Sequence, residues 1–292
     1  MREDQNLSDS SVNDDARSDA AAAPSGVDTQ AARRLRSPFE RALVEALARR
    51  GMRLEEVCPI GDAVARRLLA EYGAMFVAAE CVRVPPVCVF CSEAEVSAFQ
   101  REAAPEAAMF GEDRVELQPA ALKALLAARA EARAAGLDIT PRGGEEAGRR
   151  SYEDSVRLWR SRVLPALDHW CAAGRLTSRR AEGLCALPLH AQVEQVLALE
   201  ACGLFFSKDF SKSILHSVAA PGASQHLALL AFDVTEFRDP AVRGTLARHG
   251  WFQTVCSDLP HFTFLGLDES ELPARGLKRI ETGGQIFWIP NI

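Results

Sequence analysis

One carboxylate stands inside an otherwise apolar run, and this combination constrains the fold more than any other feature of the chain. Residues 227–234 are all apolar except Asp233, which is typical of a buried strand. Burying an ionised carboxylate is costly unless it is paired with another group or bound to a metal. The fold must therefore supply Asp233 with a cation or a hydrogen-bonding group, unless the residue simply caps a helix that begins at Thr235-Glu236.

Two histidines are candidate partners for this carboxylate. His226 follows the turn-forming pair Pro221-Gly222, and His261 opens a second strand-like segment. Two imidazoles and one carboxylate are a common ligand set for catalytic zinc, with the fourth position left for water. Residues seven apart face opposite sides of a regular strand, so we expect His226 to lie in the turn. Asp258, three residues before His261, is the candidate general base.

The length and charge of the chain limit its function. With 292 residues, 48% of them hydrophobic, it can bury a core without help from a metal, so a metal site would be catalytic. Residues 1–30 hold seven of the 40 acidic and two of the 34 basic residues, which leaves 33 and 32 in the remainder. No basic patch indicates a nucleic-acid partner. Residues 1–36 are polar and acidic, and we expect them to be disordered.

Helical and strand patterns are mixed along the chain without a regular βαβ repeat, which predicts an α+β fold. We expect a mostly helical region over residues 37–136 and a second domain over 137–292. Apolar spacing and capping residues predict a helix starting at residue 37 and helices over 62–72, 93–101, 119–135, 151–170, 189–201 and 240–249. Short apolar runs predict strands over 74–79, 86–90, 138–140, 227–234, 261–265 and 286–289.

The sequence gives no sign of export or of membrane insertion. The first 30 residues lack the basic start and apolar core of a secretory signal. No stretch approaches about 18 consecutive apolar residues, so we expect no membrane-spanning segment. By sequence alone the protein is expected in the cytoplasm, and its oligomeric state is left open.

The spacing of the candidate ligands resembles a known family. Ser224-x-His226, six residues, then Asp233, followed by Gly250-Trp251 and Asp258-x-x-His261, resembles the VanY-type D-alanyl-D-alanine carboxypeptidases. These are zinc peptidases of the hedgehog/DD-peptidase fold, a small antiparallel sheet flanked by helices. The resemblance covers residues 138–266, roughly half of the chain.

The resemblance assigns a role to each of these residues. It implies that His226, Asp233 and His261 bind Zn²⁺ and that Asp258 is the catalytic carboxylate. Ser224 matches the serine that precedes the first ligand, whereas Leu229 stands where the family has a glycine. Both positions lie within the motif that runs from Ser224 to His261.

The resemblance also implies residues that contact the substrate. Arg150, directly before Ser151, matches an upstream arginine that steadies the substrate carbonyl, a role that suits the charge and fork shape of a guanidinium. The segment from Arg150 to Ser224 is longer than in the family and contains Lys208 and Lys212. Either lysine is a candidate to assist the arginine or to bind a substrate carboxylate.

The implied activity is hydrolysis of a short peptide, with a peptidoglycan stem peptide that contains D-amino acids as the expected partner. Two other classes of function stay open. One is a non-catalytic module that binds zinc or a peptide on the same fold; Asp258 counts against it, because a purely structural site needs no base. The other is a cytoplasmic regulatory protein, which the absence of an export signal favours.

Overall fold

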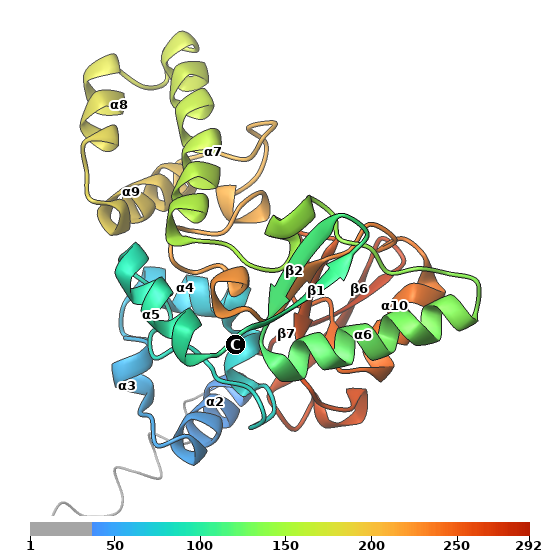
Figure 1. The fold of residues 1–292 in the computed structure, drawn as a ribbon. Coiled ribbons are helices and arrows are strands. Elements are labelled where there is room, and N and C mark those ends of the chain that lie inside the picture. Colours follow the sequence, from blue (N-terminus) through green and yellow to red (C-terminus); the bar gives the residue numbers. More distant parts are fainter. Residues whose placement is uncertain (1–36) are drawn as a thin grey trace, which may run out of the picture. The chain divides into compact units, whose positions relative to one another are not determined.

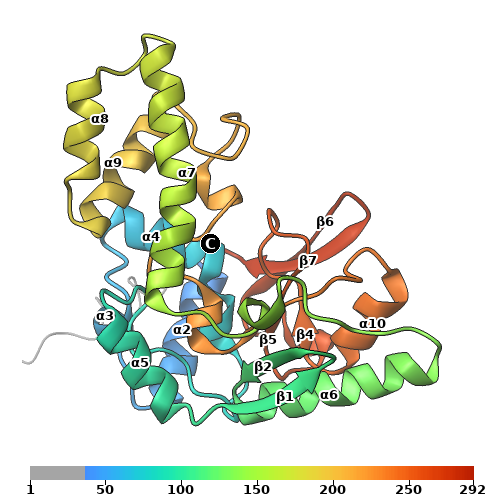
Figure 2. The same ribbon diagram turned by 45° about the horizontal axis from the view of Figure 1, so that its top comes forward.

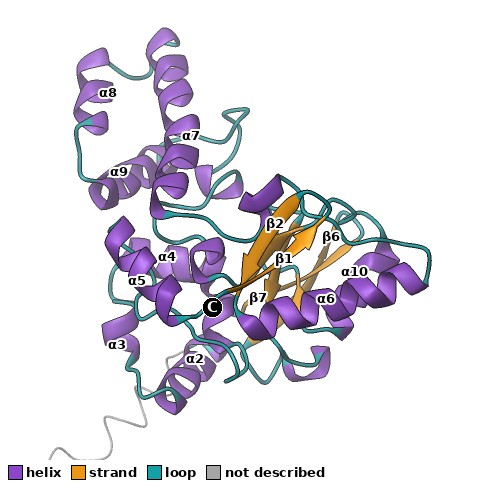
Figure 3. Ribbon diagram, viewed as in Figure 1, coloured by secondary structure: helices purple, strands orange, loops and turns teal. Residues whose placement is uncertain are grey.

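The protein is described here by a computed structural model covering residues 37–292, which form one unit with an α+β fold (Figure 3). This confirms the predicted fold class: the N-terminal part is mainly helical, and small antiparallel sheets lie in the C-terminal part. The expected disorder of residues 1–36 lies outside the described residues. Among residues 37–292, no helix is long and apolar enough to cross a membrane.

The N-terminal part begins with short helices that start at capping residues. The side chain of Ser37 accepts a hydrogen bond from the Glu40 backbone, and the side chain of Glu40 accepts one from the Ser37 backbone, which fixes the start of the first helix. Asp62 and Ser92 cap later helices in a similar way. The elements are α2 (Pro38–Arg49), α3 (Leu54–Val57), α4 (Ala63–Tyr72), the 3-10 helix η1 (Gly73–Val77) and α5 (Glu93–Glu102).

A hairpin and a group of helices follow. The hairpin pairs β1 (Glu106–Phe110) with β2 (Asp113–Leu117), and α6 (Pro119–Ala134) packs on it (Figure 1). After a short 3-10 turn, η2 (Gly144–Ala147), three helices pack in sequence: α7 (Tyr152–Ala172), α8 (Ser178–Cys185) and α9 (Leu189–Ala201). A reciprocal pair of hydrogen bonds between Ser151 and Asp154 starts α7 at the predicted residue.

The C-terminal part contains the sheet that positions the candidate ligands. Its strand order is β3-β5-β4, all antiparallel, and Asp233 on β3 is directly opposite His261 on β5. The elements are η3 (Ile214–His216), η4 (Gln225–Ala228), β3 (Ala231–Asp233), α10 (Pro240–Arg248), β4 (Trp251–Phe252), β5 (His261–Phe264), η5 (Glu269–Glu271) and the hairpin β6 (Leu277–Thr282) with β7 (Gln285–Pro290).

Two clusters of buried side chains support this architecture. The larger one joins the N-terminal helices, the β1–β2 hairpin and the three-stranded sheet, with Phe39, Phe76 and Phe232 fully buried in it. The smaller one joins α7, α8 and α9 around Trp159 and reaches Tyr72 and Val255. The helices of the smaller cluster project together away from the sheets (Figure 2). The candidate site lies where residues of both clusters meet.

Several predicted strands are wrong. Residues 74–79 lie mostly in η1, and residues 86–90 form bends without a ladder. Residues 138–140 are irregular and are followed by a single bridge between Pro141 and Val234. The predicted strand 227–234 is a strand only at Ala231–Asp233, because η4 takes up its first half. The predicted strands 261–265 and 286–289 are confirmed as β5 and β7, whereas the hairpin β1–β2 and the strands β4 and β6 were not predicted.

Candidate metal centre

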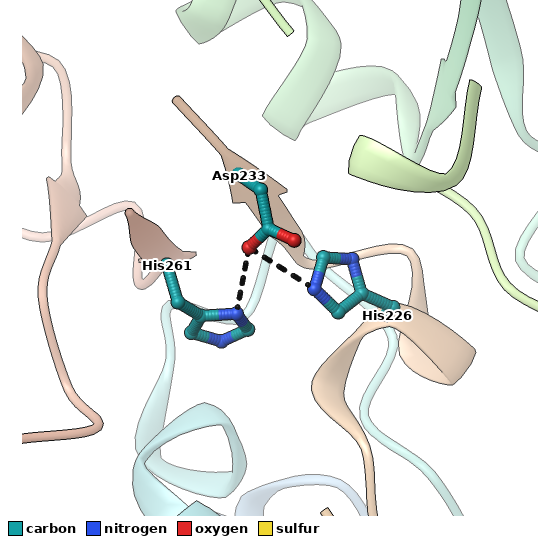
Figure 4. A group of neighbouring side chains, drawn as sticks. All are labelled: His226, Asp233 and His261. Carbon is teal, nitrogen blue, oxygen red and sulfur yellow. Dashed lines mark hydrogen bonds and ion pairs between the residues drawn. The ribbon is translucent and has the colours of Figure 1, made fainter. Parts of the chain in front are cut away.

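Three side chains from two strands and one turn converge at the centre of the site (Figure 4). Oδ1 of Asp233 lies 3.4 Å from Nε2 of His226 and 3.2 Å from Nδ1 of His261. All three residues are buried, with at most 7% of each exposed. This confirms the predicted convergence, and it has the predicted cause: His226 lies in η4 rather than on the strand that carries Asp233.

The hydrogen bond on the far side of His226 fixes which of its nitrogens faces Asp233. Its Nδ1 lies 3.1 Å from the carbonyl oxygen of Gly148, which can only accept. Nδ1 therefore carries the proton, and Nε2 of the neutral ring presents a lone pair to Asp233. This buried Nε2 has no hydrogen-bond partner within residues 37–292. Burial, followed by the positive charge of Arg150, lowers the pKa of His226 to about 4, so the ring is neutral at pH 7.

A hydrogen bond to Gln225 likewise determines which nitrogen of His261 faces Asp233. The amide nitrogen of Gln225 donates to the carbonyl oxygen of Tyr72 at 2.8 Å, which leaves its Oε1 as an acceptor facing His261. Nε2 of His261 donates to that Oε1 at 2.7 Å. Nδ1 is then the nitrogen that faces Asp233. Gln225 thus sets the orientation of His261, as groups behind metal-ligating histidines commonly do.

The second oxygen of the central carboxylate has a different partner. Nη2 of Arg150 donates to Oδ2 of Asp233 at 2.6 Å, and Nε of Arg150 donates to the carbonyl oxygen of Glu146 at 3.1 Å. The ion pair with Arg150 favours the ionised form of Asp233, whose Oδ1 is directed at the two histidines.

These contacts fit a bound cation. Nε2 of His226, which has no hydrogen-bond partner within residues 37–292, and Nδ1 of His261 both face one oxygen of the buried Asp233, and a cation among them would compensate the charge of the carboxylate. Ligand atoms at about 2.0–2.2 Å from a tetrahedral ion stand roughly 3.3–3.6 Å apart, close to the 3.4 and 3.2 Å found here. His226, Asp233 and His261 thus form a buried group that could hold a metal ion.

The group borders a pocket of about 180 Å³, which supplies room for a substrate. Its walls include His226 and His261, together with Asp258, Arg150 and Ser224. Asp258 is partly buried, and this burial is the main cause that raises its pKa above the usual value of 3.8. The negative charge of Asp233 also raises this pKa, whereas His261 lowers it. A carboxyl group of this kind is suited to exchanging protons.

The structure places the remaining candidate residues differently. Lys208 and Lys212 are exposed in the segment that follows α9, and neither lines the pocket, so their role in binding a substrate stays a prediction. Gln225 and the carbonyl of Gly148, which orient the two histidines, were missed. Gln225 lies between Ser224 and His226 in the motif, and this adjacency is the one signal that could have identified it.

Comparisons with known proteins add no family assignment. No protein-family model matches the chain, and no curated protein matches it either.

Proposed function

We propose that the protein is a zinc-dependent peptidase whose centre is formed by His226, Asp233 and His261. The observation that carries this proposal is the convergence of two imidazole nitrogens, one of them the Nε2 of His226 that has no partner within residues 37–292, on one oxygen of a buried carboxylate that also pairs with Arg150. The pocket beside them contains a carboxyl group with a raised pKa, Asp258, in reach of a substrate. A purely structural metal site would need neither the pocket nor this carboxyl group.

These ligands suit zinc better than magnesium or calcium. Imidazole is a preferred ligand for zinc, copper, iron and nickel, whereas magnesium and calcium prefer all-oxygen sites. Two histidines and one carboxylate leave one tetrahedral position for water or substrate, the usual arrangement in catalytic zinc sites. Each ligand also has a hydrogen bond on the side away from the other two. Gly148 bonds to His226, Gln225 bonds to His261, and Arg150 bonds to Asp233.

The chain's own residues divide the work of hydrolysis. A bound zinc ion would supply Lewis-acid chemistry and lower the pKa of water. Asp258 accepts a proton from the water that attacks the scissile carbonyl and returns it to the leaving amine. Arg150 also lines the pocket. Its Nη2 and Nε donate to Asp233 and Glu146, but its Nη1 has no hydrogen bond within residues 37–292. That Nη1 is available to stabilise the negative charge that develops on the carbonyl oxygen.

The resemblance to the VanY-type carboxypeptidases supports this proposal through Leu229, although that residue departs from the family motif. Leu229 has a φ of +58° and is fully buried. This left-handed conformation costs a residue with a side chain about 1–2 kcal/mol and is natural for glycine, the residue that the family motif has there. The backbone conformation at this position therefore agrees with the motif even though the residue does not. The hedgehog/DD-peptidase fold is part of the same proposal.

The proposed substrate is a short peptide that contains D-amino acids, cut at a terminal or an internal bond. The test combines metal analysis of the purified protein with hydrolysis of peptides ending in D-alanyl-D-alanine. We expect about one zinc per chain in the wild type and in Asp258→Ala, and release of D-alanine by the wild type alone. The variant separates catalysis from metal binding, because Asp258 is not among the proposed ligands.

Two results would contradict the proposal in different ways. Wild-type protein that does not bind zinc would rule out the metal centre. Zinc binding without hydrolysis of any of the peptides would instead favour a non-catalytic module that binds zinc or a peptide.

A further inference from the structure

A second arginine lines the pocket, at some distance along the chain from the metal group. Arg162 lies on α7, where Ser155, Leu158 and Arg162 follow at intervals of three and four residues. Such residues share one face of a helix, and here that face forms one wall of the pocket. Arg162 therefore belongs to the same cavity as the metal ligands, but on the side built by the helices of the smaller core.

Neutral groups hold this guanidinium in place without compensating its charge. Nε of Arg162 donates to Oγ of Ser217 at 2.8 Å, and Nη1 donates to Oγ of Ser161 at 2.9 Å. Nη2 has no hydrogen bond within residues 37–292, and no carboxylate of that part of the chain forms an ion pair with Arg162. By contrast, Arg157 on the same helix pairs with Glu146 and Asp154.

Of the two arginines that line the pocket, Arg162 is thus the one without an ion pair within residues 37–292. The other, Arg150, is already paired with Asp233 at 2.6 Å. A guanidinium held by its Nε and Nη1 presents its remaining N–H groups in a fixed direction. This preorganised fork matches the oxygens of a carboxylate, and charge-assisted hydrogen bonds of this kind are about twice as strong as neutral ones.

We infer that Arg162 binds the free carboxylate of the peptide substrate and so determines that the enzyme cuts at the C-terminal end of a chain. This inference rests on the proposed peptidase function. A bond in the interior of a peptide is followed by a neutral amide, which would leave the charge of Arg162 uncompensated. Apolar side chains of Leu158, Leu215 and Val218 line the same cavity and suit a small apolar side chain next to the carboxylate.

The test compares two ligands that differ only in the terminal charge: N-acetyl-D-alanyl-D-alanine as the free acid and as the carboxamide. Binding is measured by calorimetry on the zinc-loaded full chain with Asp258→Asn, which keeps the ligand intact. We expect the free acid to bind about tenfold or more tightly than the amide, and Arg162→Gln to remove this preference. Arg160→Gln is the matched control, since Arg160 is exposed on the same helix and does not line the pocket. It should leave the preference intact.

Several outcomes would overturn the inference. These are equal binding of acid and amide, no binding of either, or a preference that survives Arg162→Gln. Inorganic phosphate is titrated as well, and binding as tight as that of the free acid would reassign the site to phosphate groups. If the wild type hydrolyses no peptide but the acid is still preferred through Arg162, the proposed function fails while the carboxylate site stands.

Discussion

At the scale of single residues, the orientation of the three proposed ligands depends on groups outside that set. Gln225 accepts a hydrogen bond from His261 at 2.7 Å and is anchored by the carbonyl of Tyr72. Without it, Nε2 of His261 loses its acceptor, and the ring is free to place its proton on Nδ1, the nitrogen that faces Asp233. The site therefore depends on Gln225 as well as on the three ligands.

We predict that Gln225→Ala weakens zinc binding by about 10- to 100-fold, the usual effect of removing a group behind a ligating histidine. The measurement is a competition titration against a zinc chelator. Gln192→Ala is the control, because Gln192 is also buried but bonds to Trp159 and Leu184 in the smaller core. Unchanged zinc affinity in Gln225→Ala would show that His261 needs no support.

A second prediction at this scale concerns the charge of Asp258. In the metal-free protein, burial holds its pKa above 3.8, so the carboxyl group keeps its proton to a higher pH than an ordinary aspartate. Added zinc favours the charged carboxylate and should shift this pKa downward. Titration of the side-chain carboxyl carbon by NMR, with Asp258→Asn to assign the signal, measures both values. A metal-free pKa at or below 3.8 would contradict the expected effect of burial.

At the scale of elements, a turn connects the N-terminal part to the ligand His226. Gly222 has a φ of +81°, and its carbonyl oxygen accepts a hydrogen bond from the Phe90 backbone at 3.0 Å. A side chain at this position would overlap the backbone of Phe90. Only three residues lie between Gly222 and His226, so this close approach fixes where η4 begins.

We predict that Gly222→Ala lowers the free energy of unfolding by about 3–5 kcal/mol, because it combines an unfavourable φ with a backbone clash. Gly136→Ala is the matched control: Gly136 has a similar φ of +77° but open space around it, so the loss should be about 1–2 kcal/mol. Denaturant unfolding measures both. Equal losses in the two variants would mean that the contact with Phe90 adds nothing to the conformational cost.

Helices were predictable from the sequence because their signals are local. The helix at Leu189–Ala201 has the predicted ends, and α2 and α7 start at the predicted capping serines. Strands were less predictable because their ladders depend on distant segments. The run 74–79 is apolar because the surrounding core buries most of it, and this apolar pattern predicted a strand. Most of the run instead forms the 3-10 helix η1.

At the scale of the whole molecule, the candidate site was predictable only in part. The order and types of His226, Asp233 and His261 identified the metal group, and the seven-residue separation required a turn at His226. The groups behind the ligands come from distant parts of the chain. The carbonyls of Gly148 and Tyr72 are backbone atoms, which any residue carries, so no sequence pattern indicates them.

Because the ligands come from η4, β3 and β5, metal binding should stabilise the folded unit as a whole. An ion that binds only the native state adds about 4.1 kcal/mol when its free concentration is 1,000 times its Kd. For a unit of this size the corresponding rise in Tm is about 10 °C. We predict this rise when zinc is added to the metal-free protein and its loss on treatment with a chelator.

The control for this prediction compares two histidines. His226→Ala removes a ligand and should abolish most of the rise in Tm, whereas His190→Ala, at an exposed position on α9, should leave it unchanged. Scanning calorimetry of the three proteins with and without zinc gives the result. A rise of the same size in His226→Ala would place the stabilising ion elsewhere in the molecule.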